Sequence, residues 1–165
     1  MWVSPAGSPV NKPSISEHTV KSVAVFAAVC ALSLPTPLPA QMDSCDICVN
    51  IIHLRNDRGA VEVALYNSRD TFLGDSSKVF RTAEGRSKAG MSKVFFRRVP
   101  FGTYAIAVFH DENLNMKMDK GMFGIPKEGY GFSNDATGFM GAPDFDQAKF
   151  VCDRDSIPVT IKMRY

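Results

Sequence analysis

Residues 104–110 read YAIAVFH, a run rich in apolar, aromatic and β-branched residues that follows the turn sequence Pro100-Phe101-Gly102. Such a run, bounded by turn residues, is typical of a buried β-strand. Outward from it in both directions, apolar and polar residues alternate with the period of two that is expected of strands. The alternation and composition predict further strands at 47–54, 60–66, 78–83, 92–97, 147–152 and 157–165.

About seven short strands separated by turn sequences, with no long helical pattern, predict an all-β fold. We expect an antiparallel β-sandwich, immunoglobulin-like or transthyretin-like, in which 47–54 and 60–66 form a hairpin. The exception to the strand pattern is the stretch 111–145, which is rich in Gly, Asn and Asp but also carries aromatic residues. Long loops without secondary structure are usually functional or disordered, and aromatic residues favour order. We therefore predict a long ordered loop there.

The N-terminal 40 residues have the features of an export signal. Residues 23–34 read VAVFAAVCALSL, follow Lys21, and precede three prolines and Ala40. A run of about a dozen residues is too short for the roughly 20 that span a bilayer, and is typical of a signal peptide. We predict a signal peptide at 1–40, cleaved after Ala40, and one periplasmic or secreted domain at 41–165 with no transmembrane segment.

The charge of the chain gives no sign of a nucleic-acid partner. Formal net charge is +2, and no block of Lys and Arg is longer than a pair. Nucleic-acid-binding domains instead gather basic residues on one face. Composition and charge leave the true partner undefined.

Three cysteines remain in the predicted mature chain, namely Cys45, Cys48 and Cys152. An oxidising compartment favours disulfides, and the odd number leaves one thiol over. Cys45 and Cys48 form a C-x-x-C pair, but the pair leads into a strand rather than the helix of a redox site. We expect a structural disulfide from Cys152 to one of the two, to Cys45 in preference to Cys48.

The C-terminal two-fifths of the chain carries a family resemblance. Residues 100–119, PFGTYAIAVFHDENLNMKMD, and residues 124–135, GIPKEGYGFSND, resemble the bacterial family catalogued as domain of unknown function 2141. The resemblance extends over 46–165 and implies export and a β fold, but no activity. The piece 98–109, RVPFGTYAIAVF, is also similar to the corresponding hairpin of carboxypeptidase-regulatory and transthyretin-like sandwiches.

An acidic loop at 111–119 is the candidate metal site. Its oxygen-bearing residues are spaced like positions one, three, five, seven and nine of a calcium loop, with a backbone carbonyl at position seven. They are Asp111, Asn113, Asn115, Lys117 and Asp119. Met116 stands at position six, where calcium loops have Gly, and Met122 at position twelve, where they have a carboxylate. The family pattern favours glycine where this chain has Leu114 and Met116.

Two interpretations of this loop therefore stay open. Glu128, Asp135 or Asp144 could complete a calcium shell from elsewhere in the chain. In the other interpretation, the Asx side chains bond their own backbone and form a polar turn without metal.

The function predicted from these features is that of an uncharacterised extracytoplasmic binding or structural module, with calcium as the candidate stabilising ion. The predicted ligand or partner loop contains Glu128, Tyr130, Phe132 and Asn134. The alternative is a hydrolase-type enzyme that uses His110, Asp111 and Glu128, and it requires these groups to converge on a pocket. No recognised nucleophile motif accompanies them.

Overall fold

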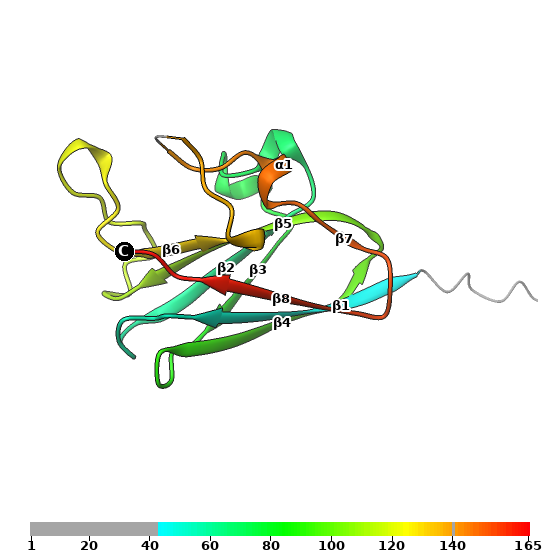
Figure 1. Ribbon diagram of the computed structural model, residues 1–165, viewed down its shortest axis with the longest axis horizontal. Helices are drawn as coiled ribbons and strands as arrows, with labels where there is room; N and C mark the ends of the chain where they lie inside the picture. Colours follow the sequence, from blue (N-terminus) through cyan, green and yellow to red (C-terminus); the bar gives the residue numbers. More distant parts are fainter. Residues whose placement is uncertain (1–42, 140) are drawn as a thin grey trace, which may run out of the picture. The chain divides into compact units, whose positions relative to one another are not determined.

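The computed structural model describes residues 43–139 and 141–165 (Figure 1). The predicted signal peptide lies outside the described residues. The described chain is mostly β-strand and forms two sheets, one of three strands in the order β4-β1-β8 and one of five strands in which β3-β2-β5-β6 is extended by β7 on β5. The predicted all-β sandwich is therefore confirmed.

The three-stranded sheet is built around β1 (Ser44–Ile52). β1 pairs antiparallel with β4 (Met91–Pro100) and parallel with β8 (Ser156–Lys162). Buried and half-buried residues alternate along β1, as they must when successive side chains lie on opposite faces of a strand. The odd-numbered residues of β1 therefore face the other sheet.

The five-stranded sheet is built around β5 (Gly102–Asp111), which contains the run quoted first. β5 pairs antiparallel with β2 (Ala60–Tyr66), β6 (Gly129–Phe132) and β7 (Phe150–Cys152). The remaining strand, β3 (Arg81–Gly85), pairs with β2. The buried hydroxyl group of Ser133 accepts a hydrogen bond from the Ile106 amide at 2.9 Å and donates one to the Ala148 carbonyl at 2.5 Å.

The main hydrophobic core lies between the two sheets and contains the branched residues of β1, β2, β5 and β8. A second apolar cluster lies on the outer face of the five-stranded sheet. Short elements and their loops cover part of this outer face (Figure 1). They are η1 (Arg69–Thr71), η2 (Ser76–Lys78), η3 (Met122–Gly124), η4 (Ser133–Asp135) and α1 (Phe145–Ala148).

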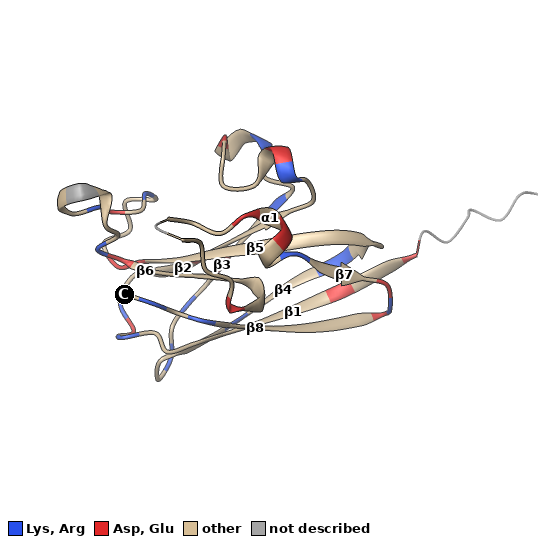
Figure 2. Cartoon of the chain, turned by 45° about the horizontal axis from the view of Figure 1, so that its top comes forward, with Lys and Arg blue, Asp and Glu red and all other residues tan. Residues whose placement is uncertain are grey.

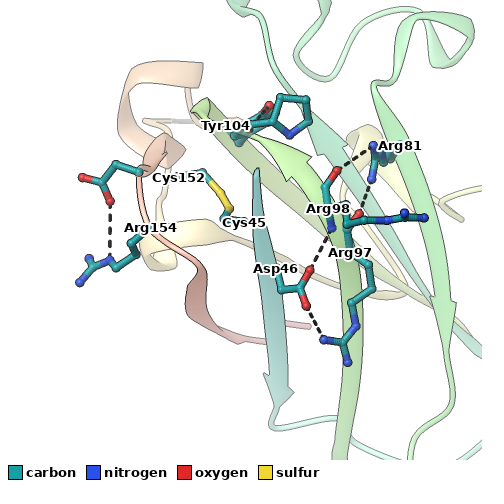
Figure 3. The surroundings of a disulfide bond; sticks show 10 residues. Cys45, Asp46, Arg81, Arg97, Arg98, Tyr104, Cys152 and Arg154 are labelled. Carbon is teal, nitrogen blue, oxygen red and sulfur yellow. Dashed lines mark hydrogen bonds and ion pairs between the residues drawn. A yellow bond between two sulfur atoms is a disulfide. The ribbon is translucent and has the colours of Figure 1, made fainter. Parts of the chain in front are cut away.

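A disulfide joins Cys45 in β1 to Cys152 in β7, with the two Cα atoms 6.3 Å apart (Figure 3). It links the two sheets across the core, because β1 and β7 belong to different sheets. Cys48 is free and half-buried. The favoured pairing, Cys45 with Cys152, is confirmed.

Four details of the predicted strand pattern are wrong. The sandwich is not antiparallel throughout, because β1 and β8 pair in parallel. β1 and β2 do not form a hairpin, since they lie in different sheets. The described residues of 111–145 do not form one long loop, because they include a strand, β6. The segment 147–152 is not one strand, because it begins in the short helix α1 and only its end forms β7.

Candidate functional site

The outer face of the five-stranded sheet carries a groove of about 750 Å³ beside the covering loops. Its floor includes Ala64 of β2 and Ala107 of β5, which lie opposite each other in the β2–β5 ladder. Alanine has no side-chain atom beyond Cβ, so the floor is low at this point. The groove exists because small residues stand where a packed outer face would need large ones.

Aromatic side chains and loop residues enclose the floor. Tyr130 and Phe132 of β6 have ring centroids 6.0 Å apart, and both line the groove. Figure 1 shows the loops after β2, after β5 and before α1 on the same side of the sheet. These loops contribute the rest of the wall, namely Leu73, Met118, Lys120, Gly124, Ile125, Pro126, Gly141 and Ala142.

The groove is mostly apolar, and among the described residues that line it Lys120 alone is charged. No Asp or Glu is among the described residues that line it. In Figure 2, the strands beneath the covering loops are largely tan, whereas the charged residues concentrate in the loops and at the sheet edges. Burial raises the pKa of Tyr66, so its phenol remains a neutral hydrogen-bond donor. The lining therefore suits a largely apolar ligand.

The acidic loop folds by bonding to itself. The Asp111 carboxylate accepts the Asn115 amide hydrogen at 3.1 Å and the Met116 amide hydrogen at 2.7 Å. The side-chain amides of Asn113 and Asn115 donate to the two oxygens of Asp119, at 2.8 and 3.0 Å. This network brings together the predicted side chains of the candidate calcium loop.

Glu128 closes the base of the same loop. Its two carboxylate oxygens accept the backbone hydrogens of Glu112 and Asp119, both at 3.0 Å. Glu128 is only 4% exposed and Asp111 only 1%, so both acids are internal supports of the loop. Across residues 43–139 and 141–165, no three His, Cys, Asp or Glu side chains gather in an arrangement that could hold a metal ion.

Two residues of the acidic loop have a backbone conformation that glycine usually adopts. Leu114 and Met116 have φ values of 62° and 59°, in the left-handed region that glycine adopts most easily. Side chains other than Gly, Asn and Asp enter this region at a cost of roughly 1–2 kcal/mol. The missing glycines therefore do not prevent the turn, and the backbone hydrogen bonds that the side chains of Asp111 and Asn113 accept help to hold it.

His110 is completely buried, and both ring nitrogens are engaged. Nε2 lies 2.7 Å from the Arg58 carbonyl, which can only accept, so Nε2 carries the hydrogen. In the neutral ring, Nδ1 accepts from the Tyr165 hydroxyl at 2.9 Å. His110, Asp111 and Glu128 are not among the residues that line the groove. They therefore do not converge on this groove, whereas the hydrolase alternative requires them to converge on a pocket.

Glu112 ties the start of the acidic loop to the β1–β2 connection. Its carboxylate accepts from Arg55 Nε at 2.7 Å and from the Asn56 side chain at 2.9 Å, and forms an ion pair with Arg58 at 3.3 Å. Burial acts to raise the pKa of Glu112, but these hydrogen bonds and the charge of Arg55 together lower it below its ordinary value.

The predicted ligand loop is only partly at the groove. Tyr130 and Phe132 line it, whereas Glu128 supports the acidic loop and the Asn134 amide donates to the carbonyls of Gln147 and Lys149. Sequence reasoning missed Ala64, Ala107 and the three loops around them. The sequence did contain a signal for the groove. Alternation assigns Ala64 of β2 and Ala107 of β5 to the outer face of the sheet, and such small residues on an apolar face indicate unfilled space.

The family comparison assigns no chemistry. The profile of a family described as uncharacterised proteins conserved in bacteria, DUF2141, matches residues 49–160. No curated protein and no solved structure matches the chain. In the part of the chain that the structure describes, no helix has the length and apolar character needed to cross a membrane.

Proposed function

The chain belongs to the uncharacterised bacterial family DUF2141, and from that premise we propose that its folded part is an extracytoplasmic binding module whose ligand occupies the groove over Ala64 and Ala107. One observation carries the proposal: a mostly apolar concavity of about 750 Å³ on a rigid sheet. Small-molecule sites are concave, mostly apolar and about 300–1,000 Å³ in volume. Loops on a rigid scaffold commonly complete them.

Two features support an extracytoplasmic location. The apolar run at 23–34 and the proline-rich boundary after it are typical of an export signal. The disulfide between Cys45 and Cys152 joins the two sheets, and such structural disulfides persist in oxidising compartments. N-terminal sequencing of the exported protein tests this part. Recovery of intact Met1 in the exported fraction would contradict it.

A binding role fits the buried polar groups better than hydrolysis does. A general base must reach the proton that it removes. His110 has no exposed surface and already has a partner at each nitrogen. The groove itself presents aromatic rings, alanines and one lysine, which can hold a molecule but include no activated nucleophile.

Binding of the neutral fluorescent probe N-phenyl-1-naphthylamine tests the groove. The probe should bind the native protein, and Ala107→Phe should weaken binding by roughly tenfold or more, because the new ring fills the floor. Thr160→Phe places the same ring on an exposed position of β8, in the other sheet, and should leave the affinity unchanged. Equal binding by all three proteins would place the probe elsewhere and contradict the proposal.

Calcium binding by the acidic loop is a second candidate function. The observation that favours it is the left-handed backbone at Leu114 and Met116, positions four and six of the loop. The ligands would be oxygens of Asp111, Asn113, Asn115 and Asp119 and the Lys117 carbonyl. Calcium has to displace the amide groups that now hold Asp119, so the dissociation constant should be weak, on the order of 0.1–1 mM.

Thermal melts in calcium and in EDTA test this candidate. At a hundred times the dissociation constant, calcium should stabilise the fold by about 2.7 kcal/mol. Asp119→Asn removes a charged ligand and one of the two oxygens that accept from Asn113 and Asn115, so it should abolish the calcium shift and lower the melt in EDTA only by the loss of one exposed hydrogen bond. Asp153→Asn, at an exposed acid elsewhere, is the matched control. If calcium at concentrations well above about 1 mM does not change the melting temperature, the acidic loop is a self-bonded turn that does not bind calcium.

A further inference from the structure

Lys120 differs from the other charged residues around the acidic loop, because it alone lines the groove. In the described part of the chain it forms neither an ion pair nor a side-chain hydrogen bond. The ammonium group therefore has no counter-charge of its own within those residues. The same is true of most described lysines, since only Lys149 and Lys162 form ion pairs, so the place of Lys120 in the lining is what distinguishes it.

The nearest acids along the chain are engaged with other groups. Asp119 accepts from the amides of Asn113 and Asn115, and Glu128 accepts from two backbone amides. Neither carboxylate forms an ion pair with Lys120. The loop thus holds its negative charge in internal hydrogen bonds and offers a positive charge at the edge of the groove.

The backbone around Lys120 is held in place. Lys120 and Pro126 form a β-bridge, the Gly121 amide donates to the Ile125 carbonyl at 2.7 Å, and the Lys127 amide donates to the Asp119 carbonyl at 2.8 Å. This short hairpin presents Lys120 and Ile125 at the groove together. A cation and an apolar side chain at the same rim match a ligand that has both an anionic and an apolar part.

The hydroxyl groups of Tyr66 and Tyr130 are further hydrogen-bonding groups in the groove. Both residues line the groove, and neither phenol forms a hydrogen bond to another described residue. A phenol can donate one hydrogen bond to an anionic oxygen. Their rings also contribute apolar wall, so an apolar chain can lie against them while a polar group meets a hydroxyl.

We propose that the ligand of the groove is a single-chain amphipathic carboxylate, of the fatty-acid type, with its chain over Ala64 and Ala107 and its carboxylate at Lys120. This inference rests on the proposed binding function and specifies its ligand class. Charge complementarity supports it, since the described lining has a lone cation and no acid. The volume of about 750 Å³ is in the range for one small molecule.

Competition against N-phenyl-1-naphthylamine tests the ligand class with three competitors of equal chain length, each below its micelle concentration. Dodecanoate should displace the probe at a concentration roughly fivefold lower than dodecanol, the size expected for one partly exposed ion pair. Dodecyltrimethylammonium should be the weakest. The advantage of dodecanoate should shrink as salt is added, because salt screens the charge.

Two lysine variants separate a specific anchor from general positive charge. Lys120→Gln should make dodecanoate and dodecanol displace the probe equally well, once each displacement is corrected for the affinity of this variant for the probe. Lys117→Gln removes an exposed charge from the same loop but outside the groove lining, and should keep the preference. A preference that survives Lys120→Gln, or equal displacement by dodecanoate and dodecanol in the native protein, would overturn the ligand class alone. Absence of probe binding would overturn the groove itself.

Discussion

The two faces of β5 carry residues of different size, and this difference separates stability from binding. The inward residues include Ile106 and Val108, which are fully buried against the other sheet. The outward residues include Ala105 and Ala107, beneath loops that cover the sheet only in part. One strand thus builds a filled core on one side and a groove floor on the other. Changes on the inner face should affect folding, and changes on the outer face should affect the groove.

The largest effect on stability should come from removing the disulfide that links the two sheets across the core. Cys45→Ala with Cys152→Ala opens a loop with a sequence separation of 107, for which the chain-entropy model gives up to roughly 4–5 kcal/mol. Urea unfolding measures the loss. Cys48→Ala is the matched control, because this residue lies on the same strand and faces outward, and it should change stability by less than about 0.5 kcal/mol. If Cys48→Ala lowered stability more than the double substitution, the assignment of Cys45 to the inner face of β1 and of Cys48 to its outer face would be wrong.

A pair of truncations within β5 tests the comparison directly. Ile106→Ala on the inner face should lower the free energy of unfolding by about 2–5 kcal/mol, since it leaves a cavity in a closed core. Phe109→Ala on the outer face removes a larger side chain that is only half-buried, and should lower it by about 1 kcal/mol. Denaturant melts of both variants decide the matter. If the outer truncation were the more harmful, the groove wall would be part of the folding core.

Much of the inner face could be predicted from sequence, because period-two alternation reports which residues share a face. Alternation placed β2 at 60–66, as observed, and predicted a strand at 157–165 that overlaps β8 except at Ser156. The same alternation also indicates which cysteine of the C-x-x-C pair forms the disulfide. Cys45 has the same parity as the buried Ile47, whereas Cys48 has the opposite parity, so only Cys45 faces the core.

Pairing partners and close approaches could not be predicted in the same way. β1 and β2 lie in different sheets, a choice that depends on the whole fold rather than on the turn between them. β6 was missed because its sequence, GYGF, is half glycine. A Cβ at Gly131 would lie 2.6 Å from Ile161 Cγ2, and one at Gly129 would lie 2.5 Å from the Tyr165 ring. The glycines therefore allow close packing against the C-terminal segment.

Part of the candidate site could likewise be predicted from sequence, and part could not. The oxygen-bearing residues of the acidic loop were visible in the sequence, but their mutual hydrogen bonds were not. The groove needs alanines from two strands and residues from three loops, so no single segment of sequence reveals it. Lys120 had no distinguishing motif, and its role follows only from its place beside the apolar lining.

A smaller effect is expected at the end of β5, where Glu112 joins the acidic loop to Arg55. Because its pKa in the folded protein is lowered, Glu112 stabilises the fold above the pKa it has when unfolded, and the contribution is lost as pH falls through the folded value. Glu112→Gln should therefore lower stability by about 1 kcal/mol at neutral pH. The variant and native curves should converge in acid. Parallel curves down to strongly acidic pH would show that Glu112 acts only through its shape.

The smallest effect should have the opposite sign. Ala107→Leu adds apolar atoms to the groove floor, where there is open space rather than packed neighbours. Fully buried methylenes contribute about 0.8 kcal/mol each, but the groove is open on one side, so the gain should be at most about 1 kcal/mol. Denaturant melts should show slightly higher stability and probe titration weaker binding. Such a trade of binding for stability is common where a site leaves apolar surface uncovered. A loss of stability would mean that the floor is already filled by the surrounding side chains, and the groove would then lack the room that a ligand requires.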